Sequence, residues 1–194
     1  MKKREATVTR KTKETDISVS VSLDGGQSLI DIQSGFLTHM FESLVRHSGI
    51  ALSLRARGDV QVDLHHTVED IGIVLGQALG QAAGDKKGIE RYGWAKIPMD
   101  ESLVEVVLDL SGRPYFQIHG KNVFRGVVGD LPLELVPEFF RSLAIHAGIT
   151  LHMEVHASGN THHLVEACFK SFARALRDAL VVTGVDIPST KDIL

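Results

Sequence analysis

Two short stretches of the 194-residue chain each carry an adjacent pair of histidines followed by a glutamate. They read DLHHTVEDIG at 63–72 and NTHHLVEACF at 160–169, and in both the glutamate lies four residues after the first histidine and three after the second. Successive residues of an α-helix are turned by about 100°, so the two histidines of a pair cannot readily converge on one ion. The spacing therefore indicates two metal ions or two separate roles, with the glutamate sharing a site with one histidine.

The types of these side chains limit the ions that they could bind. Imidazole suits Mn, Fe, Ni, Cu and Zn, and an added carboxylate shifts the preference toward harder ions such as Mn²⁺ or Fe²⁺. A finger-type zinc site is not expected, because the one cysteine, Cys168, lies in a helical pattern and is expected to be a buried thiol. The chain lacks a G-x-G-x-x-G helix start, a Walker A sequence and H-E-x-x-H, which argues against a nucleotide site and a zincin protease.

Both clusters belong to an internal repeat. Sliding the chain by 99 places lays SLVRHSGIALSL (43–54) over SLAIHAGITLHM (142–153), with six of twelve residues identical. Dropping two residues from the following turn brings the second histidine pair and its glutamate over the first. The offset of 99 also places His39 opposite Glu138. The two halves therefore carry the same cluster at the same place.

Each half shows the same order of elements, β-β-β-α-β-α. Alternating patterns, or short apolar runs after a glycine, predict strands at 16–23, 51–56, 102–110 and 150–155. Apolar residues at helical spacing predict helices at 35–49, 67–84, 133–148 and 163–184. The basic stretch 2–13 is interpreted as a solvated edge strand.

The expected fold class is α+β, with two repeated halves, each a small sheet with helices on one face, packed about a pseudo-twofold axis. We divide the chain within GIERYGW (88–94) into a first half, 1–92, and a second half, 93–194, which together form one compact unit.

The composition is typical of a soluble globular protein, with 43% apolar and 23% charged residues. The net charge of −3 provides no basic field that would attract nucleic acid or an anionic membrane. The N-terminus lacks the apolar run of a signal peptide, and no run of about 18 apolar residues marks a membrane span. We therefore expect a cytoplasmic protein with neither kind of partner.

Five histidines outside the repeated clusters are given a structural interpretation. His119 and His156 have no repeated partner, and His152 alternates with apolar residues. His47 and His146 do repeat, but each lies beside a helix-terminating glycine. A hydrogen bond to the last carbonyl groups of the helix is a sufficient role for both.

A phosphate could be bound by basic and hydroxyl side chains elsewhere in the chain. The candidates are Arg91, Arg113, Lys170, Ser189 and Lys191. Arginine and lysine bind phosphate oxygens through charge-assisted hydrogen bonds. Each of these residues alone would be interpreted as a solvated side chain. They are candidate phosphate ligands only because they accompany a metal-binding helix.

Seven stretches, taken together and in order, resemble one enzyme family. They are RKTKETDI (10–17), GFLTHM (35–40), DLHHTVEDIGI (63–73), PMDESL (98–103), DLSGRPY (109–115), GNTHHLVEACFKSFARAL (159–176) and PSTK (188–191). The chain resembles the imidazoleglycerol-phosphate dehydratases, and the resemblance covers essentially all of it. It implies two similar halves, closed homo-oligomers of 24 subunits built from trimers, and two Mn²⁺ ions per active site at subunit contacts.

The resemblance also implies roles for individual residues. The metal ligands correspond to His39, His65, His66, Glu69, Glu138, His162, His163 and Glu166. Glu138 stands where the family usually has histidine, and glutamate can still bind Mn²⁺ through oxygen. The substrate contacts fall on Glu14, Arg91, Arg113, Lys170, Ser189 and Lys191. The catalytic set comprises Glu14, His66, Glu69, His163 and Glu166. Two smaller departures are Thr38, where aspartate is common, and Asp192, where glycine is common.

The reaction implied by the resemblance is the metal-dependent dehydration of D-erythro-imidazole glycerol phosphate to imidazole acetol phosphate in histidine biosynthesis. Two ions on the ring nitrogens would hold the substrate ring as imidazolate, whose electrons expel the adjacent hydroxyl to give a diazafulvene. The next C–H then becomes acidic enough to remove. Glu14 is the candidate for proton transfer, and the basic set would hold the phosphate and orient the substrate.

Two other functions stay open from the residues alone. One is a different metal-dependent lyase or a phosphoester hydrolase, although a hydrolase has no evident need for the stretch around Glu14. The other is a non-catalytic protein that binds metal or senses a histidine metabolite. Release of inorganic phosphate would reveal the first, and tight metal binding without turnover of the imidazole substrate would reveal the second.

Overall fold

The computed structural model describes residues 3–191 and 193–194. The first half contains β1 (Glu5–Lys11), β2 (Thr15–Ser22), β3 (Leu29–Ile32), α1 (Gly35–Ser48), β4 (Ala51–Gly58) and α2 (His65–Ala83). The second half contains β5 (Tyr92–Met99), β6 (Ser102–Asp109), β7 (Tyr115–His119), a 3₁₀ turn (Lys121–Val123), β8 (Val127–Val128), β9 (Leu131–Pro132), α3 (Leu135–Ala147), β10 (Thr150–Ala157) and α4 (Thr161–Leu180). The predicted order β-β-β-α-β-α is confirmed in both halves. The second half adds the short β8–β9 hairpin before its first helix.

The two halves form four-stranded sheets of the same topology. The strand orders are β1-β2-β4-β3 and β5-β6-β10-β7. In each sheet two neighbouring pairs are antiparallel, and the remaining pair, β3 with β4 or β7 with β10, is parallel. The basic N-terminal stretch contains β1 at an outer edge, as predicted.

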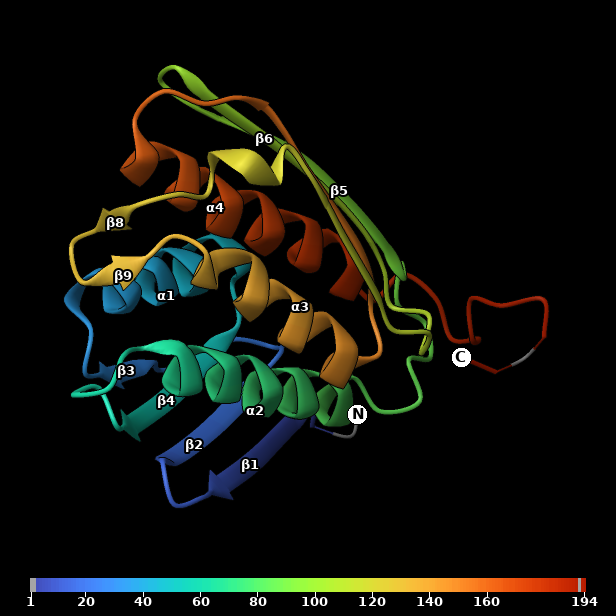
Figure 1. The fold of residues 1–194 in the computed structure, drawn as a ribbon. Helices are drawn as coiled ribbons and strands as arrows, with labels where there is room; N and C mark the ends of the chain where they lie inside the picture. Colours follow the sequence, from blue (N-terminus) through green and yellow to red (C-terminus); the bar gives the residue numbers. More distant parts are fainter. Residues whose placement is uncertain (1–2, 192) are drawn as a thin grey trace.

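The helices cover one face of each sheet and lie between the two sheets (Figure 1). The strands alternate accordingly, because the residues of β2 and β6 that point toward the helices are buried. Across the halves α1 packs against α4 and α2 packs against α3. Exchanging the halves converts each of these pairs into the other, so the packing has the expected pseudo-twofold relation. The core between the sheets includes the thiol of Cys168, whose pKa is raised by burial.

The α2 and α3 helices approach closely because α2 has glycines on the contacting face. A Cβ atom added to Gly72 would lie 2.8 Å from the carbonyl oxygen of Phe139, and one added to Gly76 would lie 2.6 Å from that of Leu143. No larger side chain fits without moving one helix. This contact brings the first turns of α2 and α3 together.

Four helix boundaries differ by two or more residues from those predicted, and one of them is the start of α3, which lies at Leu135 instead of 133. The helices α2 and α4 begin at His65 and Thr161, two residues earlier than expected, and α4 has a side-chain cap at Asn160. The Asn160 side chain accepts hydrogen bonds from the amides of the second histidine pair, and Asp63 accepts one from His65. The α4 helix ends at Leu180 instead of 184, because the following residues are extended and Val182 forms a β-bridge with Ile89.

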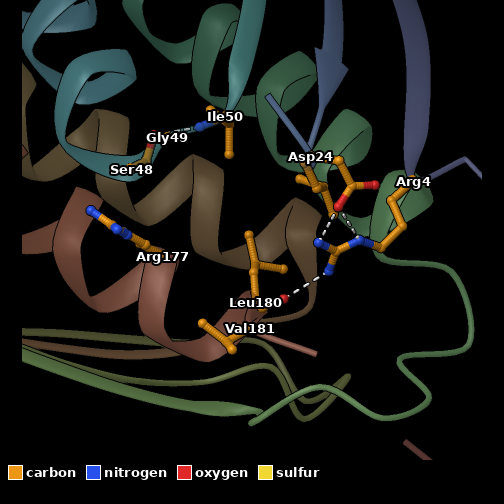
Figure 2. Close-up of a pocket in the computed structure, with 9 residues that line it drawn as sticks. Arg4, Asp24, Ser48, Gly49, Ile50, Arg177, Leu180 and Val181 are labelled. Carbon is orange, nitrogen blue, oxygen red and sulfur yellow. Dashed lines mark hydrogen bonds and ion pairs between the residues drawn. The ribbon is translucent and has the colours of Figure 1, made fainter. Parts of the chain in front are cut away.

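A cavity of about 370 Å³ lies where the first β-strand meets the end of the last helix (Figure 2). The Arg4 guanidinium is ion-paired with Asp24 and donates a hydrogen bond of 2.7 Å to the carbonyl oxygen of Leu180. One side chain of the first half thus satisfies a C-terminal carbonyl of α4, which a helix leaves without an internal partner. In the described part of the chain, no helix is both long enough and apolar enough to cross a membrane.

Candidate active site

The two histidines of each pair point in different directions from the start of their helix. The rings of His65 and His66 are inclined by 88° with centroids 5.9 Å apart, and those of His162 and His163 by 81° at 6.2 Å. The first histidine of each pair faces the glutamate one turn later. The second faces acidic residues of a neighbouring turn. Each helix start therefore contributes to two separate groups of side chains.

One group joins α1 to α4. Glu166 Oε2 lies 3.6 Å from His39 Nε2 and 3.3 Å from His162 Nε2. The candidate ligand atoms of these three residues all lie within 4.8 Å of one another, so they could hold one metal ion. Burial acts to raise the pKa of Glu166, but the hydrogen bond and charge of Lys170, together with the nearby His39 and His162, hold the pKa below its ordinary value. The carboxylate is therefore charged, as a metal ligand must be.

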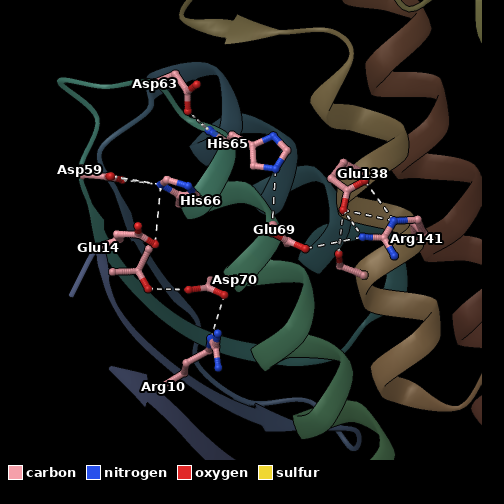
Figure 3. A network of polar contacts seen from close by, with 12 residues as sticks. Arg10, Glu14, Asp59, Asp63, His65, His66, Glu69, Asp70, Glu138 and Arg141 are labelled. Carbon is pink, nitrogen blue, oxygen red and sulfur yellow. Dashed lines mark hydrogen bonds and ion pairs between the residues drawn. The ribbon is translucent and has the colours of Figure 1, made fainter. Parts of the chain in front are cut away.

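The corresponding group joins α2 to α3. His65 Nε2 lies 3.9 Å from Glu69 Oε2, and the α3 residue Glu138 lies beside them (Figure 3). A guanidinium occupies the space between the carboxylates, because Arg141 is ion-paired with Glu138 and lies 3.5 Å from Glu69 Oε1. The hydrogen bond from Arg141 lowers the pKa of Glu138. The two halves thus differ, since His39 stands where Glu138 and its arginine stand in the other half.

His66, the second histidine of the first pair, faces two acidic residues from turns. Its Nδ1 lies 3.1 Å from Asp59 Oδ2 and 3.9 Å from Glu14 Oε2. The hydrogen bond with Asp59 raises the pKa of His66. Asp59 follows β4, and Glu14 lies in the turn between β1 and β2 (Figure 3).

His163 has an equivalent environment in the second half. Its Nδ1 lies 3.2 Å from Glu101 Oε2 and 3.9 Å from Asp100 Oδ2, both in the turn between β5 and β6. The amide of Asn160 and the histidine hydrogen-bond to Glu101, which lowers the pKa of its carboxyl group to about 2. Both second histidines therefore have Nδ1 beside a carboxylate, which leaves Nε2 for another ligand.

Three acidic residues of these groups were not singled out from the sequence, namely Asp59, Asp100 and Glu101. The repeat contained a signal for two of them, because the hairpin turns of both halves carry acidic residues. A further group of Glu105, Glu154 and His156 lies on the solvent-facing side of the second sheet. Glu105 accepts a hydrogen bond from the Trp94 indole and pairs with His156, so a cross-strand network accounts for this group.

The other four histidines outside the clusters make contacts within the fold, and the role of His47 stays a prediction. His146 Nδ1 lies 2.8 Å from the carbonyl oxygen of Ser142 in the last turn of α3. His119 and His152 stack on each other along the second sheet. Two residues were noted above as departures from the pattern of the similar family. Thr38 donates a hydrogen bond to the carbonyl oxygen of Ser34 at the start of α1, and Asp192 lies outside the described residues.

Four candidate phosphate ligands line a separate cavity of about 750 Å³. They are Arg91, Arg113, Ser189 and Lys191. Arg91 is held in place by two hydrogen bonds to Asp109 and one of 2.7 Å to the carbonyl oxygen of Pro188, and the bond to Asp109 raises its pKa. Arg113 is mostly exposed, with its guanidinium 3.5 Å from Asp109. The cavity thus presents positive charge to solvent at the C-terminal segment.

This basic cavity and the histidine groups lie at opposite ends of α4. The Arg91 amide donates to the carbonyl oxygen of Ala179, near the end of the helix, whereas His163 lies in its first turn. The sixteen residue steps from 163 to 179 correspond to about 24 Å of helix at 1.5 Å per step. The other two candidates, Lys170 and Glu14, lie with the histidines. The structure therefore divides the candidate substrate residues between two places in one chain.

The chain is thus a duplicated α+β protein whose two histidine pairs form candidate His/Glu metal sites. Comparison with known proteins identifies the family. A model of the imidazoleglycerol-phosphate dehydratase family matches residues 33–176. An imidazoleglycerol-phosphate dehydratase of Chloroherpeton thalassium is 53% identical over 197 residues, covering 100% of both chains.

Two solved structures have the same fold. Imidazoleglycerol-phosphate dehydratase from Staphylococcus aureus superposes with a TM-score of 0.84 and 44% identity over 92% of this chain and 99% of that one. The Pyrococcus furiosus enzyme in complex with (S)-C348 has a TM-score of 0.82 and 34% identity over 96% and 100%. The chain belongs to the imidazoleglycerol-phosphate dehydratase family, and it is a hydro-lyase that performs the dehydration step of histidine biosynthesis.

Proposed function

We propose that the chain converts D-erythro-imidazole glycerol phosphate to imidazole acetol phosphate with two Mn²⁺ ions per active site. The observation that carries this proposal is the group of His39, His162 and Glu166, in which two imidazole nitrogens and a charged carboxylate lie within binding distance of one ion. Nitrogen and oxygen donors of this kind fit Mn²⁺. The proposed ligands are His39, His65, His66, Glu69, Glu138, His162, His163 and Glu166.

The arrangement of each pair supports a two-ion site. The first histidine and the glutamate of each pair serve one ion, and the diverging second histidine serves another. Eight ligands give about four for each ion, which leaves positions of an octahedral Mn²⁺ open for substrate. Asp59 and Glu101 would orient His66 and His163 by accepting the Nδ1 hydrogen and leaving Nε2 for the metal.

The chain's own residues would then move the protons of the elimination. When held by the proposed ligands, the two ions would supply positive charge to the substrate ring and favour its imidazolate form. The ring electrons would expel the hydroxyl on the adjacent carbon, which takes up a proton to leave as water, and the next carbon would then lose its proton to give the enol of the ketone. Glu14, which lies 3.9 Å from His66, delivers a proton to the leaving hydroxyl or accepts the C–H proton.

The separation of the two candidate regions supports an active site shared between copies of the chain. An imidazole, a three-carbon chain and a phosphate together span on the order of 10 Å at ordinary bond lengths. This is less than half of the about 24 Å of α4 that separates His163 from Arg91. We therefore assign the basic cavity of one copy to the metal ligands of another, within a closed homo-oligomer of 24 subunits built from trimers.

A metal-binding measurement with a matched pair of variants tests the ligand assignment. Glu166→Gln removes a charged ligand from a proposed metal group, whereas Glu105→Gln makes the same change in the cross-strand network of the second sheet. Equilibrium dialysis against Mn²⁺ should show a loss of bound metal only for Glu166→Gln. Equal Mn²⁺ binding by the two variants would contradict the assignment.

The products distinguish this function from the alternatives. The proposed elimination yields one imidazole acetol phosphate for each substrate consumed and releases no inorganic phosphate. A phosphoester hydrolase would release phosphate, and a metabolite sensor would bind Mn²⁺ without consuming the substrate.

A further inference from the structure

We infer that Asp70 of α2 is a positioning residue that holds the turn carrying Glu14 in place for proton transfer, acting through Thr15 and Thr12. The inference rests on the proposed role of Glu14. None of the three residues is among the proposed ligands or substrate contacts.

Asp70 is a buried carboxylate whose partners both belong to the β1–β2 hairpin. Its side chain lies on α2, and the residue is 7% exposed. One oxygen accepts a hydrogen bond of 2.7 Å from Arg10 Nε of β1 (Figure 3). The other accepts one from the hydroxyl of Thr15, the first residue of β2. A buried charge is costly unless it is paired and hydrogen-bonded, so these contacts fix the hairpin firmly to α2.

A directed chain of hydrogen bonds continues from Thr15 to the backbone of Glu14. The Thr15 hydroxyl has one hydrogen, which it donates to Asp70, so in its 3.1 Å contact with Thr12 it accepts. The Thr12 hydroxyl then donates to Thr15 and accepts from the amides of Glu14 at 3.0 Å and Thr15 at 2.9 Å. Each hydrogen donated in this series of hydrogen bonds points toward Asp70, and the Asp70 carboxylate is the final acceptor.

The internal repeat shows that the helix itself does not need this carboxylate. The residue of α4 that matches Asp70 is Ala167, which is also buried. In the second half the hairpin acid Glu101 contacts the helix start directly, through the Asn160 amide at 2.6 Å and His163. At this position of the repeat, the buried acid thus occurs in α2, the helix that contacts the Glu14 turn, and not in α4.

Kinetics of variants at Thr15 test the inference. Thr15→Val keeps the shape of the side chain but removes the hydroxyl, and Thr15→Ser keeps the hydroxyl. With Mn²⁺ bound, Thr15→Val should lower kcat about ten- to a hundred-fold, the size expected when a catalytic group is displaced by about 1 Å, and leave KM and Mn²⁺ content unchanged. Thr15→Ser should restore kcat, and Asp70→Asn should reproduce the valine variant. An unchanged kcat in Thr15→Val and Asp70→Asn would overturn the inference.

A double-mutant cycle with Glu14→Gln separates positioning from general support of the fold. If Thr15 acts through Glu14, Thr15→Val should cause no further loss of kcat in the Glu14→Gln background. An equal loss in both backgrounds would show that Thr15 only supports the fold. If Glu14→Gln alone keeps a kcat near wild type, the proposed role of Glu14 fails and the inference fails with it. If Glu14→Gln is inactive and Thr15→Val is normal, only the inference fails.

Discussion

At the scale of single residues, each histidine of a pair has a different carboxylate partner. His65 and His162 face the glutamate of their own helix, and His66 and His163 face acids of neighbouring turns. An imidazole whose Nδ1 is hydrogen-bonded to a carboxylate has a fixed tautomer and ring orientation, and its Nε2 becomes a better metal ligand. In the proposed site, the turn acids would therefore control how strongly the second histidine of each pair binds metal.

The Asp59→Asn variant tests this effect. The amide of asparagine is nearly the same size as the carboxylate but lacks its charge, so His66 loses the partner that raises its pKa and fixes its orientation. We expect Mn²⁺ affinity to fall about 10- to 100-fold while the fold is kept. Isothermal titration with Mn²⁺ measures the affinity, and circular dichroism controls for folding. An unchanged Mn²⁺ dissociation constant would show that Asp59 does not orient a ligand.

The spacing of residues predicted part of the candidate site and could not predict the rest. Histidine and glutamate within one helical turn share a face by geometry alone, so the pairing of His162 with Glu166 follows from local structure. Glu101 is 62 positions from His163, and its contact depends on how a hairpin folds over a helix start. Arg141 was missed for the same reason, because its contact with Glu69 exists only where α2 and α3 cross.

At the scale of elements, the close contact of α2 and α3 depends on glycines of α2. An alanine normally stabilises a helix interior relative to glycine by up to about 1 kcal/mol. At Gly76 the added methyl would meet the carbonyl oxygen of Leu143 at 2.6 Å, and overpacking of this kind typically costs about 1–3 kcal/mol. At Gly76 the cost of overpacking therefore exceeds the gain in helix propensity, and alanine should destabilise the fold.

Gly76→Ala and Gly80→Ala form a matched pair on this face. A Cβ at Gly80 would meet its nearest atom at 3.4 Å, which is close to ordinary contact. We expect Gly76→Ala to lower the free energy of unfolding by about 1 kcal/mol or more, and Gly80→Ala to leave it unchanged or raise it. Urea denaturation followed by circular dichroism measures both. Equal stabilities would contradict the close contact.

The second sheet has a cross-strand link whose strength depends on pH. Glu105 of β6 accepts a hydrogen bond from Trp94 of β5 and pairs with His156 of β10 and with Lys96. The indole hydrogen bond is the main cause that lowers the pKa of Glu105 to about 2, from an ordinary value of 4.5. Because the folded-state pKa is depressed, the stabilisation is fully present above 4.5 and is lost as the pH falls toward about 2.

We therefore expect Glu105→Gln to lower the melting temperature at neutral pH. The difference from the wild type should shrink as the pH falls from 4.5 toward about 2, because the wild-type carboxylate becomes protonated over this range. Scanning calorimetry of both proteins across the pH range measures it. A difference that stays constant with pH would show that the charge of Glu105 contributes nothing.

The fold was predictable in its main elements, and the errors lie where local patterns are weak. The spacing of apolar residues predicted the repeated β-β-β-α-β-α order, because a strand buries every second residue and a helix every third or fourth. The β8–β9 strands have two residues each, too few to show an alternation. The end of α4 was predicted four residues too late. The apolar residues after Leu180 continue the helical pattern, but in the structure Val182 forms a β-bridge with Ile89.

At the scale of the whole molecule, the two halves form one core, and the proposed active site extends beyond one chain. The helix pairs across the halves and the Arg4 contact with the end of α4 join the halves. The division into 1–92 and 93–194 stays a prediction. The basic cavity lies at the far end of α4 from the histidine groups, so in the proposed oligomer one copy of the chain would hold parts of more than one site.

Mixing two inactive variants tests the shared site. His163→Ala removes a proposed metal ligand, and Arg113→Ala removes a cation from the basic cavity. When the two are dissociated and reassembled together, intact sites form where the cavity of one variant meets the metal ligands of the other. Random assembly should restore up to about a quarter of the wild-type activity. Each variant reassembled alone is the control, and a mixture as inactive as its components would place each site within one chain.

The most direct test of the central claim is to measure dehydration as Mn²⁺ is returned to metal-stripped protein. Formation of imidazole acetol phosphate from D-erythro-imidazole glycerol phosphate should be absent in the stripped protein, because the ring is not held as imidazolate without the ions. Activity should return on addition of Mn²⁺ and reach its maximum at two ions per active site. Full activity in the stripped protein, or maximal activity at one ion per site, would contradict the two-ion account.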